Sequence, residues 1–118
     1  MAPYQTLKAW QHAERLAIEC VQVSKKFPDY EQARLADQLR RASYSVVLNI
    51  AEGSSRHSRD DYTRFLEIAT GSVFEVVSQS FIGRNQGFLN EEQFRALYAA
   101  AEEQSRMLSG LRRSLCLP

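Results

Sequence analysis

The chain has 118 residues, of which 44% are hydrophobic and 25% charged, the balance of an ordinary globular domain. Its 15 basic and 14 acidic side chains leave a formal charge of +1, so the molecule as a whole lacks the strong positive field typical of nucleic-acid or anionic-membrane binding. Three prolines and five glycines are too few for a many-turned β fold and favour long helices.

The first two predicted helices cover about residues 7–27 and 30–53. Steps of three and four residues, typical of one helical stripe, relate Trp10, Ala13, Ala17, Cys20, Ser24 and Phe27 in the first helix. Pro28 ends this helix, and Asp29 with Gln32 forms a capping-box pattern for the second. The stripe of the second helix is Leu35, Leu39, Ala42, Val46 and Asn49. Gly53 is placed to end it in the left-handed conformation.

The third and fourth predicted helices cover about residues 58–86 and 90–115. Ser58 caps the third, whose stripe is Tyr62, Leu66, Ala69, Val73, Val76 and Ser80. Gly87 stops it, and Asn90 with Gln93 opens the fourth. The fourth stripe is Phe94, Leu97, Ala101, Gln104, Leu108, Leu111 and Leu115.

Short connections force each helix to run back beside the one before it, and a seven-residue repeat favours left-handed packing. The sequence therefore predicts an all-α fold: a single domain, residues 1–118, built as an antiparallel up-down-up-down four-helix bundle of left-handed twist.

Two of these helices carry more apolar surface than one bundle core needs. Beyond the core stripes lie Tyr44, Val47, Leu48 and Ala51 on the second helix, and Phe74 and Phe81 on the third. One interpretation is a wide core that takes these residues in. We favour the alternative, a homo-oligomer interface, because a monomer rarely exposes a contiguous apolar strip.

The sequence predicts no catalytic, metal-binding or cofactor-binding residues. The two histidines, His12 and His57, form no Glu-x-x-His pair, and no Gly-rich phosphate loop or nucleophile elbow is present. Cys20 and Cys116 lie far apart and are interpreted as unpaired thiols of a reducing cytoplasm. With no leader or membrane span evident, we expect a cytoplasmic, non-enzymatic protein without a small-molecule substrate or membrane partner.

Asn49 and Gln104 interrupt otherwise apolar seams. Such amides either line a polar pocket, together with Glu52, or set the register of packing, which is the commoner role. Glu75 could pair with Arg41 on the neighbouring helix as a structural contact.

Antiparallel topology is expected to gather several basic residues at one pole of the bundle: Lys8, Arg56, Arg59, Arg64, Arg106, Arg112 and Arg113. The plainer interpretation is a solvated pole whose charges complement helix dipoles. The functional interpretation is an electrostatic platform for phosphate backbones, of low sequence specificity and steep salt dependence.

The segment "QLRRASYSVVLNIAEGSSRHSRDDYTRFLEIATGSVFE" resembles the four-helix-bundle proteins named after intervening sequences in bacterial 23S rRNA genes. The resemblance depends on Arg41-Ala42, the run from Asn49 to Gly53, Phe65-Leu66, Ile68-Ala69, and Gly71-Ser72 with Glu75. It implies a bundle that assembles into a ring, with a pentamer expected, and no known catalytic residues. A related group, the accessory proteins of diversity-generating retroelements, is similar in fold and binds nucleic acid through basic surface, whereas this chain is almost neutral.

A folding role would account for the residues of this motif, namely Arg41, Asn49, Glu52, Gly53, Gly71 and Glu75. In this interpretation Gly53 closes the second helix, Asn49 and Glu52 hydrogen-bond the following turn, and Gly71-Ser72 permits close contact between the second and third helices. The predicted function is a non-catalytic oligomeric scaffold or interaction protein; the alternative is a low-specificity RNA- or DNA-binding protein.

Overall fold

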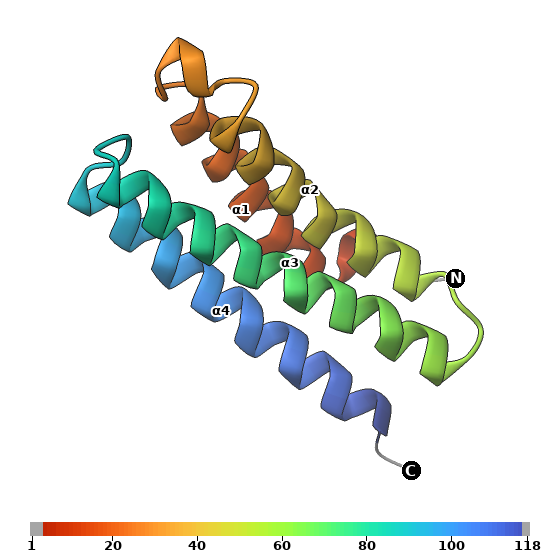
Figure 1. Ribbon diagram of the computed structural model, residues 1–118. Coiled ribbons are helices and arrows are strands. Elements are labelled where there is room, and N and C mark those ends of the chain that lie inside the picture. The colour runs from red at the N-terminus through yellow and green to blue at the C-terminus, as the bar shows by residue number, and fades with distance from the viewer. Residues whose placement is uncertain (1–3, 117–118) are drawn as a thin grey trace.

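The computed structural model describes residues 4–116, which fold into four long helices and two short 3₁₀ turns (Figure 1). The helices are α1 (Lys8–Ser24), α2 (Leu35–Ser54), α3 (Arg59–Asn85) and α4 (Glu91–Cys116). The 3₁₀ turns are Tyr4–Thr6, before α1, and Asp29–Glu31, between α1 and α2. The predicted domain spans residues 1–118, of which residues 1–3 and 117–118 lie outside the described part of the chain.

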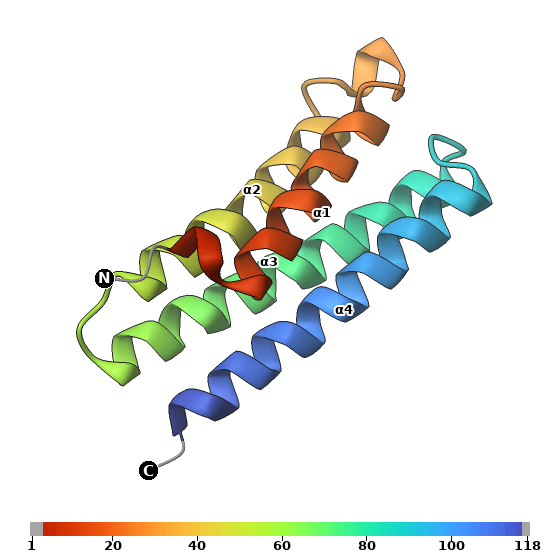
Figure 2. The ribbon, with the colours of Figure 1, turned by 180° about the vertical axis from the view of Figure 1, so that it is seen from behind.

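The four helices pack side by side into an elongated bundle of 48 × 22 × 20 Å. α2 lies against α1 and α3, and α4 lies against α3 and α1. The connection between α2 and α3 lies at the same end of the bundle as the start of α1 and the end of α4 (Figures 1 and 2). The predicted all-α four-helix bundle is thus confirmed, while its left-handed twist stays a prediction.

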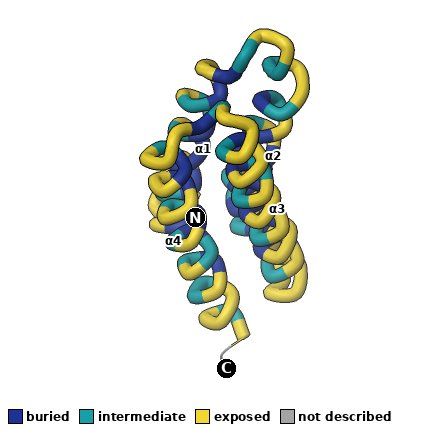
Figure 3. Tube along the Cα trace, turned by 60° about the vertical axis from the view of Figure 1, so that its left-hand side comes forward, coloured by how far each residue is buried: buried dark blue, intermediate teal, exposed yellow. Residues whose placement is uncertain are grey.

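The core follows the predicted stripes on α1, α3 and α4. One end of the core is built around Val46, Ile50, Leu66, Val73 and Leu108, and the other around Leu16, Leu39, Val76, Leu89 and Leu97. Figure 3 shows buried residues on the sides of the helices that face one another and exposed residues on the outer sides. On α2, Ile50 is fully buried and takes the place expected for Asn49, which lies half-buried on the flank.

By length and composition α3 is apolar enough to cross a membrane. Its leucine, alanine and valine stripe, however, is buried against the other helices: Leu66, Ala69, Val73 and Val76 are at most 1% exposed. This stripe of α3 therefore serves the core of the bundle, while Ile68, Phe74, Phe81 and Ile82 of the same helix are exposed.

The starts of α3 and α4 are capped as the sequence predicts. Ser58 Oγ accepts a hydrogen bond from the backbone N–H of Asp61 at 3.1 Å. At α4, Asn90 Oδ1 accepts from Gln93 N at 2.7 Å, and Gln93 Oε1 accepts from Asn90 N at 2.9 Å, a reciprocal capping box. Gly87, with φ of 82°, supplies the left-handed residue after α3.

The prediction for the connection between α1 and α2 is wrong in detail. α1 ends at Ser24 rather than at Phe27, and α2 begins at Leu35 rather than at residue 30. Gln32 makes no capping box with Asp29: its Nε2 donates instead to the carbonyls of Ser24 at 2.8 Å and Phe27 at 2.9 Å. The side chain of Gln32 therefore satisfies carbonyls at and just after the end of α1. The sequence pattern had extended α1 to Phe27 and had assigned Gln32 to the start of α2.

Gly53 is a buried helical residue, not the left-handed residue that closes α2. A Cβ atom built on it would lie 2.9 Å from Phe65 Cβ and 3.1 Å from Tyr62 Cδ1 on α3. Gly71 takes no part in the expected Gly71-Ser72 contact, because a Cβ there would meet nothing within 4 Å. Ser72 does make the contact: it is buried and donates to Ser45 Oγ on α2 at 2.7 Å. The close approach of α2 and α3 is thus made at Gly53.

Candidate interaction surfaces

One hollow on the surface is the α1–α2 groove, of about 540 Å³. Its apolar lining comes from Ala17, Ile18 and Val21 of α1 and from Tyr44, Val47 and Leu48 of α2. Leu48 is 64% exposed, Ile18 52% and Tyr44 46%, so three large apolar side chains face solvent side by side. Three residues of the predicted interface, Tyr44, Val47 and Leu48, meet here because 44, 47 and 48 share one face of α2.

A second hollow, the α3–α4 groove of about 350 Å³, lies between the other two helices. Phe74, which is 63% exposed, lines it with Val77, Tyr98 and Ala101, and Glu102 and Arg106 are its charged residues. This places Phe74 in a different groove from Tyr44 and Leu48.

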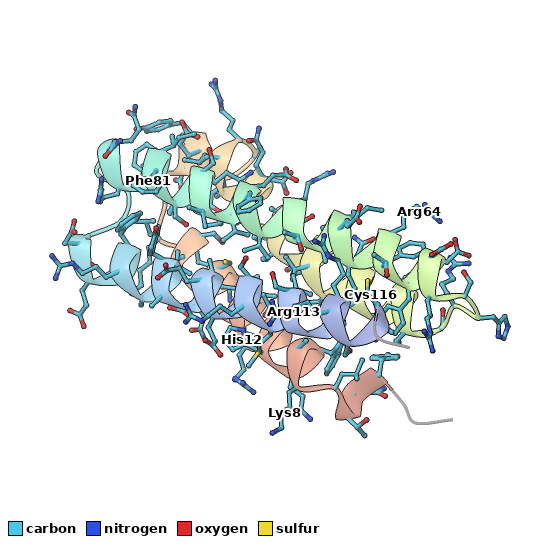
Figure 4. All side chains as sticks on the ribbon, turned by 90° about the horizontal axis from the view of Figure 1, so that it is seen from below. Lys8, His12, Arg64, Phe81, Arg113 and Cys116 are labelled. Carbon is cyan, nitrogen blue, oxygen red and sulfur yellow. The ribbon has the colours of Figure 1, made fainter. Side chains whose placement is uncertain are left out.

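Phe81 belongs to an aromatic cluster rather than to an open strip. Its ring lies 4.8 Å from that of Phe94 and 6.0 Å from that of Tyr98, measured between centroids. The guanidinium of Arg84 stacks over both phenylalanine rings, at 5.2 Å from Phe81 and 4.2 Å from Phe94. Phe81 therefore packs partly against residues of its own subunit. Figure 4 shows Phe81 at the end of the bundle far from Arg64.

The six predicted interface residues thus form no single strip across α2 and α3. Tyr44, Val47 and Leu48 face the α1 side of the helix pair, and Phe74 faces the α4 side. Ala51 lies in a third hollow of about 500 Å³, beside Asn49, Glu52 and Tyr4. The reason lies in helix packing: α2 and α3 turn their closest faces toward each other, so their spare apolar faces point to opposite flanks.

Four of the seven predicted basic residues are held by acidic neighbours. Arg56 pairs with Glu52, Arg64 with Asp61 at 3.8 Å, Arg106 with Glu103 at 2.7 Å, and Arg112 with Glu67 at 3.8 Å. Three of the four pairs join residues three or four apart in the chain, so the positive charge is largely neutralised where it arises.

The basic residues also do not face one way. Figure 4 shows Lys8 and Arg64 pointing to opposite sides of the bundle, with Arg113 on α4 between them. Arg56 and Arg64 do converge, because both guanidiniums stack on the ring of Phe65, at 4.7 and 4.8 Å from its centroid. Arg59 is exposed at the start of α3.

The motif residues Asn49 and Glu52 have separate roles. Asn49 Nδ2 donates to the carbonyl of Ser45 at 2.8 Å and to its hydroxyl at 3.0 Å, so it bonds back along α2 and not to the turn. Glu52 does reach the turn, through its ion pair with Arg56.

Arg41 does not pair with Glu75. Its Nε donates to Asp37 Oδ2 at 2.8 Å, and its side chain is 78% exposed. The structural arginine is the neighbouring Arg40, which no local sequence pattern marks. It donates to Ser24 Oγ at 3.0 Å and to the Gln32 carbonyl at 2.7 Å. Arg40 could have been found only by knowing that the loop before α2 folds back over α1.

Gln104 is a fully buried amide whose nitrogen and oxygen each have a partner. Its Nε2 donates to the carbonyl of Ala9 at 3.1 Å, and its Oε1 lies 2.7 Å from His12 Nδ1. Because the amide oxygen only accepts, Nδ1 of His12 carries the hydrogen. This amide therefore ties α4 to α1, in agreement with the register role.

Burial raises the pKa of the Cys20 thiol to about 12, while Cys116 is exposed. Burial also raises the pKa of the Glu19 carboxyl, an effect opposed by the nearby His12. Within residues 4–116 no three His, Cys, Asp or Glu side chains come close enough to hold a metal ion.

Comparison with known proteins identifies relatives by sequence and by fold. A family profile described as 23S rRNA-intervening sequence protein matches residues 5–110. The crystal structure of a protein of unknown function from the S23 ribosomal protein family of Bacteroides thetaiotaomicron superposes with a TM-score of 0.82. It is 19% identical in sequence, and the match covers 88% of this chain and 97% of that chain, which establishes likeness of fold. No curated protein matches the chain.

Proposed function

This chain belongs to the 23S rRNA-intervening sequence protein family, and on that premise we propose that it is a non-catalytic scaffold subunit that works as a homo-oligomer. The observation that carries the proposal is the pair of open apolar grooves, one on each flank of the bundle. Among the residues that line the grooves, Leu48 and Phe74 are each more than 60% exposed. Burying these two side chains against another copy would therefore contribute most to the free energy of association.

Grooves on opposite flanks suit head-to-tail assembly. When one face of a subunit binds a different face of the next, the contact is heterologous and closes into a ring if the rotation allows it. Each groove also carries charges of both signs, Glu14 and Lys25 in the α1–α2 groove and Glu102 and Arg106 in the α3–α4 groove. The resemblance in sequence implies five subunits, and this is the ring size we propose.

The native mass of the purified protein, measured by light scattering after size exclusion, tests the proposal. We expect a mass several times the 13.5 kDa of one chain, falling to that of smaller species in Leu48→Asp and Phe74→Asp. Tyr30→Asp is the matched control, because Tyr30 is 67% exposed but lies outside both grooves. A wild-type mass of 13.5 kDa at micromolar concentration would refute the oligomer.

A second candidate, low-specificity binding of RNA or DNA, is favoured by the Arg56–Phe65–Arg64 stack. Two exposed guanidiniums on one ring offer phosphate contacts, and a ring of subunits would repeat them. Fluorescence anisotropy with labelled RNA and DNA over a salt series tests it, with Arg56→Ala/Arg64→Ala as the variant. Binding that is undetectable at low salt, or equal in the variant, would remove this candidate.

A further inference from the structure

The outer face of α2 and α3 holds a polar hollow, which we call the α2–α3 notch, of about 330 Å³. Its walls are Gln38, Arg41, Ala42 and Ser45 of α2 and Glu75 and Gln79 of α3. Neither apolar groove includes these residues, so the notch is a separate feature of the surface.

Gln79 Oε1 is fully buried and has no hydrogen-bond partner, the one such side-chain atom in the described part of the chain. Buried polar atoms in folded proteins are nearly always paired, so an orphan at the wall of a hollow indicates a donor from outside the subunit. Glu75, one turn earlier on the same face of α3, adds an exposed carboxylate that makes no ion pair within residues 4–116. The two acceptors together call for a cationic N–H donor.

The same notch carries a donor of that kind. Arg41 uses its Nε on Asp37 and extends its guanidinium, 78% exposed, toward solvent. The Arg41 guanidinium of one copy can therefore bind the Glu75 carboxylate and the Gln79 amide oxygen of the next copy.

Gly71 explains how a second copy could come close enough. It lies one turn before Glu75 on α3, is exposed, and has nothing within 4 Å of the place a Cβ would take. Nothing inside the subunit requires glycine at this point of the helix. A neighbouring chain can therefore approach the α3 backbone here more closely than at any residue with a side chain.

We propose that the α2–α3 notch is a contact between copies of this chain, in which Arg41 of one copy binds Glu75 and Gln79 of its neighbour. The proposal rests on the self-association proposed above and adds a polar, charge-specific contact to the apolar grooves. It also assigns a role to Arg41, Gly71 and Glu75, which the fold of the subunit leaves without one.

Charge exchange tests the contact. Arg41→Glu and Glu75→Arg each place like charges together, so each should weaken self-association at least tenfold, about 1.4 kcal/mol, measured by sedimentation over a concentration series. The double variant Arg41→Glu/Glu75→Arg restores opposite charges between copies and should regain the wild-type mass. Glu92→Arg, on an exposed acid at the start of α4 outside every hollow described above, is the matched control.

The outcomes separate the two proposals. A monomeric wild type overturns both. An oligomeric wild type that Phe74→Asp dissociates but Glu75→Arg does not change overturns the notch contact alone. A double variant that remains as weak as the single variants also overturns it, because pairing of these two side chains would then not be what holds the copies together. Circular dichroism of each variant confirms that it is folded.

Discussion

Replacing Gly53 by alanine adds one methyl group at the closest approach of α2 and α3. That carbon would lie 2.9 Å from Phe65 Cβ and 3.4 Å from the carbonyl oxygen of Tyr62, both of which move only if the helices move. Overpacking of this kind costs about 1–3 kcal/mol. Alanine is favoured over glycine inside a helix by about 1 kcal/mol, so the expected net change in the free energy of unfolding runs from zero to a loss of about 2 kcal/mol.

Gly71→Ala is the matched variant, because it makes the same chemical change in a neighbouring helix where the added carbon meets nothing. In the dissociated subunit, where no neighbouring copy lies against α3, it should gain the helix-propensity term of about 1 kcal/mol with no packing cost. Guanidinium denaturation followed by far-UV circular dichroism measures both variants, at a protein concentration where each is monomeric. A Gly53→Ala variant as stable as Gly71→Ala would refute the view that Gly53 permits the close helix contact.

Three further predictions concern Gln104, the arginines Arg40 and Arg41, and the two cysteines. Gln104→Ala should lower the free energy of unfolding by about 2 kcal/mol, because it leaves a cavity and removes the hydrogen bonds to Ala9 and His12. A urea-denaturation midpoint equal to that of the wild type would contradict this prediction. Arg40→Ala should lower the free energy of unfolding of the isolated subunit by about 1.5–3 kcal/mol, whereas Arg41→Ala should change it by less than about 0.5 kcal/mol. Equal decreases in the thermal stability of the two variants would contradict the structural role of Arg40. Cys116 should react with a thiol reagent in the native state and Cys20 only after unfolding. Because folding raises the pKa of Cys20 from 9.0 to about 12, its contribution to stability is complete below pH 9 and should be lost as the pH rises toward 12, a loss that Cys20→Ala should not show.

Much of the bundle could be predicted because the deciding signals are local. The stripe on α3, the Ser58 cap, the Asn90–Gln93 capping box and Gly87 each depend on residues within one or two turns of one another. Local spacing sets which face of a helix is apolar and where a helix begins, whatever it later packs against.

The connection between α1 and α2 could not be predicted in the same way. Gln32 fits a capping box by spacing, but in the fold it caps α1 and is held by Arg40, eight residues later. Gly53 lies where the sequence pattern ends the second helix, but the structure requires glycine there for another reason. A Cβ atom at this position would be too close to α3. In both cases a contact between two helices overrides a valid local pattern.

Local residue patterns specify four amphipathic helices and show that two of them carry surplus apolar residues. Packing of the helices against one another places the surplus apolar residues Leu48 and Phe74 on opposite flanks. It also brings the polar residues Arg41, Glu75 and Gln79 together around one notch. The physical reason is the rotation of each helix about its own axis. Periodicity defines the faces of a helix relative to one another, but packing against neighbouring helices sets the direction in which each face points.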